Sequence, residues 1–143
     1  MTTTPLPDAP VRSADELTER WATLLAPPLF DARSLWLAWL DTDGVQFPVV
    51  VPVDDLPALP SPDVLRNLLH LHAAVTERSG FADGHLALAL CRPGAPTVTE
   101  DDDEWAEALR EEFDAQVEGT WSLHLAAGGS VVPLVSPPRW RRG

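Results

Sequence analysis

The stretch that decides the fold is residues 85–118, HLALALCRPGAPTVTEDDDEWAEALREEFDAQVE. It begins with a continuous apolar run over residues 85–91, which is typical of a strand buried on both faces of a sheet. The prolines and glycine of residues 92–96 predict a tight turn. A helical pattern follows, in which large apolar residues recur at every fourth position: Trp105, Leu109 and Phe113. Ligands of α/β proteins often bind where a strand end meets a helix start, so this junction is the first candidate site.

The rest of the chain predicts further helices and strands on both sides of this stretch. In order, the expected elements are a helix from Ser13, strands over 34–40 and 45–53, a helix from Ser61 to Gly80, the strand and helix of residues 85–118, and strands over 121–126 and 130–135. The order α-β-β-α-β-α-β-β predicts an α/β protein with a mixed β-sheet and helices packed on its faces.

Proline placement and length predict how the chain is divided. Residues 13–136 are expected to form a single α/β domain, because a chain of 143 residues suits one core. Residues 1–12 are rich in proline and threonine and are expected to be a flexible N-terminal segment, and residues 137–143 a basic C-terminal tail. Pro48 and Pro52 both lack an amide on the same side of their strand, which predicts an edge strand.

The charge of the chain is concentrated in one helix. Residues 100–118 hold ten acidic residues against Arg110 alone, so they carry −9 of the net charge of −12. This field argues against binding to nucleic acid or to an anionic membrane. It is compatible with a basic protein partner, whereas a solubilising helix face is the favoured interpretation.

The remaining composition points to the cytoplasm. The single Cys91 cannot form an internal disulfide, which is typical of a reducing compartment. The first residues have no basic region followed by an apolar core, so no signal peptide is expected. No apolar run is long enough to span a bilayer.

The histidines and the cysteine do not form a recognised catalytic or metal-binding pattern. His70 and His72 are two apart on a helix and point in different directions. His85 and His124 lie near strand ends, and their spacing does not bring them together. Cys91 stands beside an arginine, which lowers a thiol pKa in reactive sites, but a buried inert thiol is the favoured interpretation. The sequence contains neither of the glycine-rich motifs that bind phosphates and dinucleotides, Gly-x-x-x-x-Gly-Lys and Gly-x-Gly-x-x-Gly. It also lacks the Gly-x-Ser-x-Gly motif of serine hydrolases.

Three consecutive carboxylates, Asp101, Asp102 and Asp103, raise the question of a divalent cation. Consecutive helical residues point about 100° apart and do not converge on one ion. Thr99 and Asp102 have the spacing of a capping box, and acids in a first turn complement the helix dipole. Capping therefore explains these acids without a metal.

The junction resembles the metal-binding segment of the JAB/MPN metalloprotease fold, especially its RadC-like branch. In that family a buried strand ends in His-x-His-Pro-Ser-Gly, followed by a proline-containing loop, a Ser or Thr, and an Asp on the next helix. Here residues 90–95 stand at that motif, and Pro96, Thr99 and Asp102 follow in the same order. The resemblance covers roughly residues 34–135 and implies the three-layer arrangement of JAB and deaminase-like proteins.

The same resemblance implies that no catalytic metal or other cofactor is held. The two zinc-binding histidines of the family fall at Leu90 and Arg92, and only the third position, Asp102 or Asp103, keeps a suitable group. The glutamate that acts as the family's general base also has no counterpart, because no glutamate lies in residues 20–76. One carboxylate does not hold a catalytic zinc.

The expected function is therefore that of a non-catalytic, metal-free RadC/JAB-like domain, a protein-interaction or accessory module with an acidic helix. Its candidate recognition residues are Arg92, Asp101, Asp102, Asp103, Glu104, Glu107 and Glu111. The enzyme alternative is a metal-dependent hydrolase with an acidic and histidine site at the 91–103 junction, which would use Asp102 or Asp103 together with a histidine from elsewhere, such as His85 or His124. A homo-oligomer that pairs through the edge strand is a further alternative. Trp140 and its neighbouring arginines either dock onto the acidic helix or form an unstructured tail.

Overall fold

The computed structural model describes residues 10–137, which form three helices and five strands. In chain order they are α1 (Ala14–Leu24), β1 (Ser34–Leu40), β2 (Gln46–Val53), α2 (Pro62–Ser79), β3 (His85–Cys91), α3 (Glu100–Gln116), β4 (Thr120–Ala127) and β5 (Ser130–Val135). The predicted order of elements is confirmed. None of the helices in the described part is long and apolar enough to cross a membrane.

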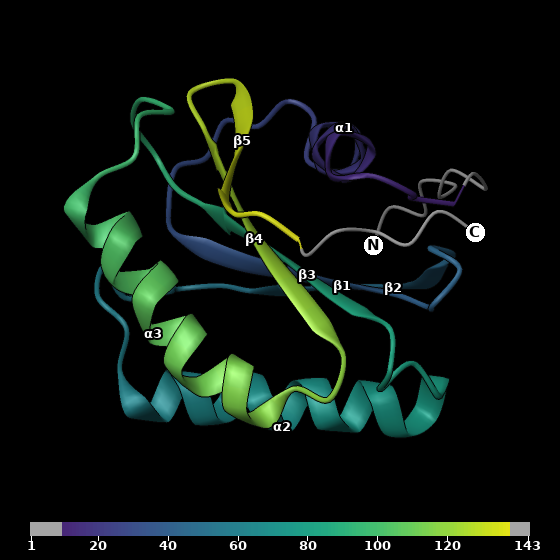
Figure 1. Ribbon diagram of the computed structural model, residues 1–143. Coiled ribbons are helices and arrows are strands. Elements are labelled where there is room, and N and C mark those ends of the chain that lie inside the picture. Colours follow the sequence, from purple (N-terminus) through teal and green to yellow (C-terminus); the bar gives the residue numbers. More distant parts are fainter. Residues whose placement is uncertain (1–9, 138–143) are drawn as a thin grey trace.

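The five strands form one mixed sheet in the order β2-β1-β3-β4-β5. β3 and β4 are parallel, and the other neighbouring pairs are antiparallel. Figure 1 shows α1 on one face of this sheet and both α2 and α3 on the other, so the predicted α/β fold in three layers is confirmed. β2 lies at an edge, as its prolines predict.

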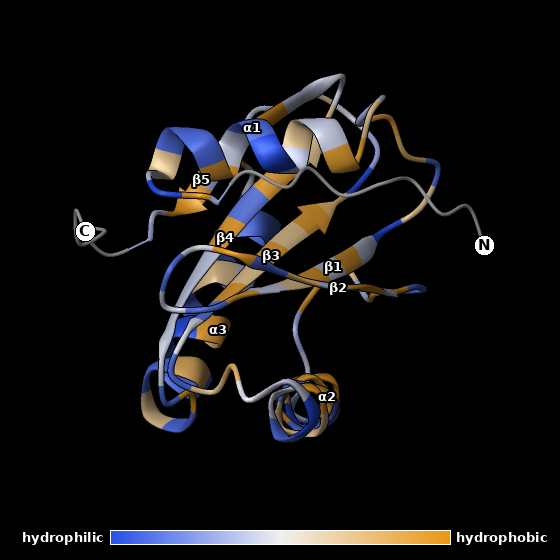
Figure 2. Ribbon diagram, turned by 90° about the vertical axis from the view of Figure 1, so that its right-hand side faces the viewer, coloured by the Kyte–Doolittle hydropathy of each residue, from blue (hydrophilic) through white to orange (hydrophobic). Residues whose placement is uncertain are grey.

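Each face of the sheet has its own apolar core. Toward α2 and α3 the strands present large side chains, among them Trp39 and Leu88. Toward α1 they present smaller ones, such as Ala87 and Ala89, beneath Trp21 of the helix. The hydropathy colours of Figure 2 show apolar strands at the centre and polar outer faces on the helices. Successive residues of a strand point to opposite faces of the sheet. Because helices cover both faces, the central strands are apolar throughout.

All three helices begin, and α2 ends, at residues that local chemistry predicts. The side chains of Ser13, Ser61 and Thr99 each cap a helix by accepting a hydrogen bond from a backbone N–H in its first turn. Gly80 ends α2 in the left-handed conformation, with φ of 76°. These local interactions explain why most boundaries agree with the prediction.

Two boundaries differ from the prediction. Val11 is only 2% exposed and donates its N–H to the carbonyl of Gly44 at 2.8 Å, so the packed part of the chain begins before Ser13. α3 ends at Gln116 instead of continuing to the glycine at 119, because Val117 turns into an extended conformation and is buried. The predicted docking of Trp140 falls outside the described residues.

Candidate functional site

The junction between β3 and α3 is built on the centre of the sheet. All seven residues of β3 are buried. Alternate residues of a strand point to the same face, so Arg92 follows Leu88 and Leu90 toward α3. The backbone N–H of Arg92 donates to the carbonyl of Ala126 on β4 at 3.2 Å. The sheet therefore holds Arg92 in a fixed position near the start of α3.

The Arg92 guanidinium has an acceptor for each of the five N–H groups that an arginine carries. Its Nε donates to Oδ1 of Asp102 at 2.9 Å, and its Nη2 donates to Oδ2 of the same residue at 2.7 Å. Its Nη1 donates to the carbonyl oxygens of Pro93 and Ala95, each at 3.0 Å. Nη2 also donates to the carbonyl of Thr97 at 2.9 Å. One side chain thus ties the strand end, the turn and the helix start together.

Asp102 is fully buried in the first turn of α3. Its carboxylate accepts the N–H of Thr99 at 2.9 Å, and its own N–H donates to Oγ1 of Thr99 at 3.3 Å, which confirms the predicted capping box. Burial alone raises the pKa of this carboxyl, but the hydrogen bonds from Arg92 and Thr99 and the charge of Arg92 outweigh burial and lower the pKa of Asp102. The hydrogen bond to Asp102 raises the pKa of Arg92. The ion pair is therefore charged at neutral pH.

Arg92 and Asp102 do not lie on the surface, although the sequence predicted both as recognition residues. Their side chains are 4% and 0% exposed, so a partner cannot touch Asp102 and reaches almost none of Arg92. Both residues support the junction from inside. Sequence reasoning explained the acid by capping and missed the ion pair. The only signal for the pair is an arginine directly after a buried strand and a capping acid on the next helix.

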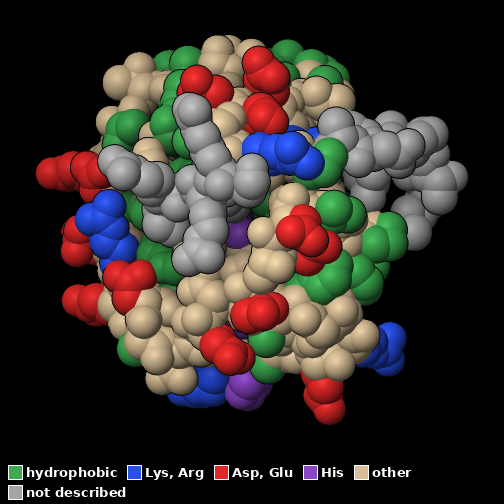
Figure 3. Space-filling view, turned by 45° about the vertical axis from the view of Figure 1, so that its right-hand side comes forward, with side chains coloured by type: hydrophobic (Ala, Val, Ile, Leu, Met, Phe, Trp, Pro, Cys, Tyr) green, Lys and Arg blue, Asp and Glu red, His purple; other side chains and the backbone are tan. Residues whose placement is uncertain are grey.

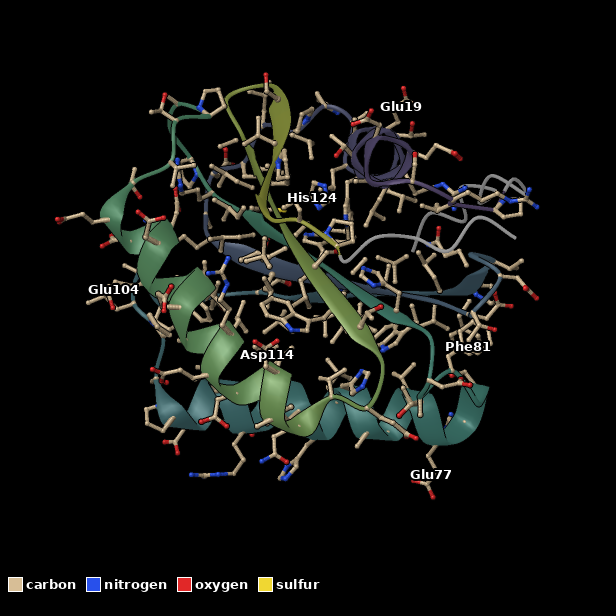
Figure 4. All side chains as sticks on the ribbon, in the orientation of Figure 1. Glu19, Glu77, Phe81, Glu104, Asp114 and His124 are labelled. Atoms are coloured by element: carbon tan, nitrogen blue, oxygen red, sulfur yellow. The ribbon has the colours of Figure 1, made fainter. Side chains whose placement is uncertain are left out.

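The other predicted acids lie on the outer side of α3. We define the acidic stripe as the exposed carboxylates that follow one another at intervals of three or four residues: Glu100, Glu104, Glu107 and Glu111. This spacing places them on one face of the helix. Figure 4 shows Glu104 pointing away from the sheet. Arg110 is the one basic residue of α3, and its Nη1 lies 3.6 Å from Oε1 of Glu107.

Asp101 and Asp103 lie beside the stripe at the start of α3. Asp103 is exposed. The Asp101 side chain is 44% exposed, and its Oδ2 lies 3.7 Å from Nη2 of Arg33. Figure 3 shows acidic side chains dispersed over the face of the molecule that it presents. The acidic stripe differs from this dispersed arrangement because all of its carboxylates lie on one helix, α3.

The histidines of the enzyme alternative do not lie at the junction. His85 begins β3 and Cys91 ends it, so the strand separates them by about 20 Å at roughly 3.3 Å per residue. His124 contacts Thr18 of α1, whereas Arg92 points to the opposite face of the sheet. Figure 4 shows His124 on β4, on the side of the sheet that α1 covers.

The remaining candidate groups are structural. His70 is exposed, whereas His72 is buried and accepts the indole N–H of Trp39 at 3.1 Å, so the two histidines diverge as predicted. Burial raises the pKa of the Cys91 thiol to about 12, which leaves it protonated and inert. Within residues 10–137, no three histidine, cysteine or acidic side chains gather as metal ligands do.

Sequence reasoning also missed a group of buried polar contacts beneath α1. Nε2 of His124 lies 2.9 Å from Oγ1 of Thr18. The ring nitrogens of His85 lie 2.7 Å from Oγ1 of Thr120 and 2.8 Å from Oγ of Ser122. Burial lowers the pKa of His85 to about 3, with a smaller contribution from His124, and lowers the pKa of His124 itself to about 4. Both rings are therefore neutral at neutral pH.

The fold and the junction together define a class of protein: a three-layer α/β domain whose strand–turn–helix junction is closed by an internal ion pair. Comparison with protein-family models, with curated proteins and with solved structures finds no match for this chain. The assignment of a function therefore depends on the geometry of these residues.

Proposed function

We propose that this chain is a metal-free relative of the RadC-like JAB domains and that it binds a basic protein through α3 without catalysis. The first part is supported by the place of the buried ion pair. By the resemblance, Arg92 and Asp102 stand at two of the family's zinc-ligand positions, and here the two side chains bond to each other at 2.7 Å and 2.9 Å. A guanidinium thus neutralises the carboxylate that a metal ion would need.

The observation that carries the binding proposal is the acidic stripe. Its carboxylates are exposed on one helix face, and Arg110 is the one basic side chain on that helix. Trp105 and Phe113 on the opposite side of α3 are completely buried, so the stripe is presented on a rigid element. The negative electrostatic potential of these carboxylates attracts a basic partner toward α3 and disfavours an acidic one. We place this function in the cytoplasm, where a single cysteine stays reduced.

Removing two charges from the stripe is expected to weaken partner binding. The stripe variant combines Glu104→Gln and Glu111→Gln, which keep side-chain size and lie outside the core. The experiment uses the wild type and the variant as baits for affinity purification, followed by titration of the purified captured protein. We expect a basic protein that the variant binds roughly twofold to thirtyfold more weakly, since each exposed ion pair contributes about 0.2–1 kcal/mol.

The matched control combines Glu19→Gln and Glu77→Gln, which remove the same charge from α1 and α2. Figure 4 shows that both residues lie away from α3. The control is expected to bind the partner as the wild type does. Equal losses in the stripe variant and in this control would mean that only net charge matters, and the proposal would then fail.

The hydrolase alternative is tested by metal analysis of the purified protein. We expect no stoichiometric zinc, because both oxygens of Asp102 are already bonded to Arg92. Elemental analysis of the wild type and of Asp102→Ala provides the measurement. Stoichiometric zinc in the wild type that disappears in the variant would overturn the metal-free assignment.

A further inference from the structure

An open cavity of about 310 Å³, which we call the α3–β5 groove, lies beside the C-terminal half of α3. Its lining residues come from that half of the helix, the link to β4, the start of β4 and the end of β5. A second open cavity, of about 460 Å³, lies beside β1 and is lined by Arg33 and neighbouring loop residues. The α3–β5 groove differs from it because regular elements form most of its walls and the apolar core lies directly beneath them.

The floor of the groove is apolar and held in place. Phe113 is fully buried, and its ring packs edge to face on that of Trp121, with ring centroids 5.8 Å apart. The indole N–H of Trp121 donates to Oδ1 of Asp114 at 2.7 Å, and Figure 4 shows Asp114 on the side of α3 that faces β4. The surface that stays open to water belongs to Trp121, Val117 and the half-buried Val135. A large apolar group laid on this floor would remove that surface from water.

The rim of the groove is acidic. Asp114 lines it, and the exposed Glu118 lies next to its lining residues. The last turn of α3 has no basic residue, whereas that of α2 has Arg78. The end of a helix carries a partial negative charge, so a cation is stabilised there. Arg110 also lines the groove, but its guanidinium lies 3.6 Å from Glu107. The groove therefore suits a segment that combines an aromatic ring with positive charge.

The chain itself supplies such a segment at this point. Ser136 lines the groove, and residues 138–143, Pro-Arg-Trp-Arg-Arg-Gly, follow just beyond the described part. They carry three arginines, one tryptophan and no acid. Trp140 follows Ser136 by four positions, which an extended chain spans in about 13 Å at roughly 3.3 Å per residue. The helical wall from Arg110 to Val117 is only about 10 Å long, so Trp140 is within reach of the groove.

We propose that residues 138–143 dock in the α3–β5 groove of their own chain, with the ring of Trp140 on Trp121 and Val135 and the arginines beside Asp114 and Glu118. Tryptophan has a large apolar surface to bury. A tether of a few residues gives an effective concentration in the millimolar range, so a weak contact is populated. The docked segment presents the same groups as a basic partner and shields the C-terminal half of α3 from it. This regulatory part of the inference rests on the proposed function, whereas the docking does not.

The indole N–H signals of the full chain provide the first test. The sequence has six tryptophans, so an isotope-labelled sample gives six indole signals in an NMR spectrum, and Trp140→Ala removes that of Trp140. We expect the Trp140 signal to lie away from that of a solvated tryptophan peptide. The amide signals of Asp114, Val117 and Trp121 should also differ between the wild type and the variant. A Trp140 signal at the solvated position, with differences confined to residues 136–143, would overturn the inference.

Dilution distinguishes docking within one chain from exchange between two chains. We expect the Trp140 signal to stay in place on dilution, and sedimentation to give a monomer. A dimer whose Trp140 signal moves to the solvated position on dilution would place the segment on a second copy, and docking within the chain would then be wrong.

The second test removes the acidic rim by combining Asp114→Asn and Glu118→Gln. The asparagine keeps an oxygen that accepts the indole N–H of Trp121. The Glu19→Gln and Glu77→Gln control carries the same charge change. We expect the Trp140 signal to move toward the solvated position in the rim variant and to stay in place in the control. Equal movement in both variants would mean that only net charge matters and would contradict the role of the groove.

The third test separates this inference from the proposed function. A short capped peptide of alternating alanine and arginine, titrated into the full chain by calorimetry, should bind Trp140→Ala several-fold more tightly than the wild type, although the net charge is the same. Equal binding would overturn the shielding of α3. A docked Trp140 together with a Glu104→Gln and Glu111→Gln variant that binds its captured partner as the wild type does would refute the proposed function and leave the docking intact. A solvated Trp140 together with weak binding by that variant would refute the docking alone.

Discussion

Asp102→Ala is expected to remove about 3–5 kcal/mol from the free energy of unfolding, which is the range for breaking a buried ion pair from one side. The guanidinium of Arg92 would remain 4% exposed with no counter-ion. The first turn of α3 would also lose the carboxylate that accepts the N–H of Thr99. Since whole domains are stable by about 5–15 kcal/mol, this one change approaches global unfolding. Urea denaturation, followed by tryptophan fluorescence and circular dichroism, measures the loss.

Two further variants show whether charge is the cause. Asp103→Ala changes the next residue, which is exposed, and should cost no more than about 0.5 kcal/mol. The double variant Arg92→Met with Asp102→Ala should be more stable than Asp102→Ala alone, because it removes the uncompensated charge. A loss for Asp102→Ala as small as that for Asp103→Ala would contradict this account of the junction.

Lowering the pH from 7 to 5 is expected to destabilise the fold by about 4 kcal/mol through His85 and His124. Their folded-state pKa values are about 3 and about 4, below the ordinary value of 6.5. Below about pH 6.5 the unfolded chain therefore binds protons that the folded chain does not. The stability is complete above pH 6.5 and falls as the pH drops toward the folded values. Denaturation midpoints measured at intervals between pH 7 and pH 5 test this.

His124→Gln serves as the control for the pH effect. It removes one of the two rings whose pKa values are lowered most. Burial also lowers the pKa of His72, so the slope of stability against pH between 5 and 6 should fall by somewhat less than half. The carboxyl of Asp102 has a lowered pKa and titrates below this window, so it does not obscure the slope. Equal stability at pH 7 and pH 5 would show that neither ring is buried in its neutral form.

The proposed binding surface was predicted only in part. The acids Glu104, Glu107 and Glu111 lie on the outer face of α3, where helical spacing and charge place them. The α3–β5 groove was not predicted, because it joins α3 to the start of β4 and the end of β5. The cavity beside β1 was not predicted, because it joins the segment that precedes β1 to the loop that follows β2. Arg33 has no signal in the sequence that separates it from any other surface arginine. The burial of its Nη1, which has no hydrogen-bond partner among the described residues, results from tertiary packing.

The sequence by itself determined the order of the elements and where most of them begin and end. Caps such as Thr99, breakers such as Gly80 and the apolar run of residues 85–91 act over a few positions, so their effects can be read along the chain. The capping-box spacing with Thr99 singles out Asp102 from the run at 101–103, but only the tertiary structure decided that this acid is buried and pairs with an arginine. The turn after β3 folds back and brings Asp102 onto Arg92, while its two neighbours face outward to different degrees. That pairing depends on the fit of a helix against a sheet, which no local pattern records.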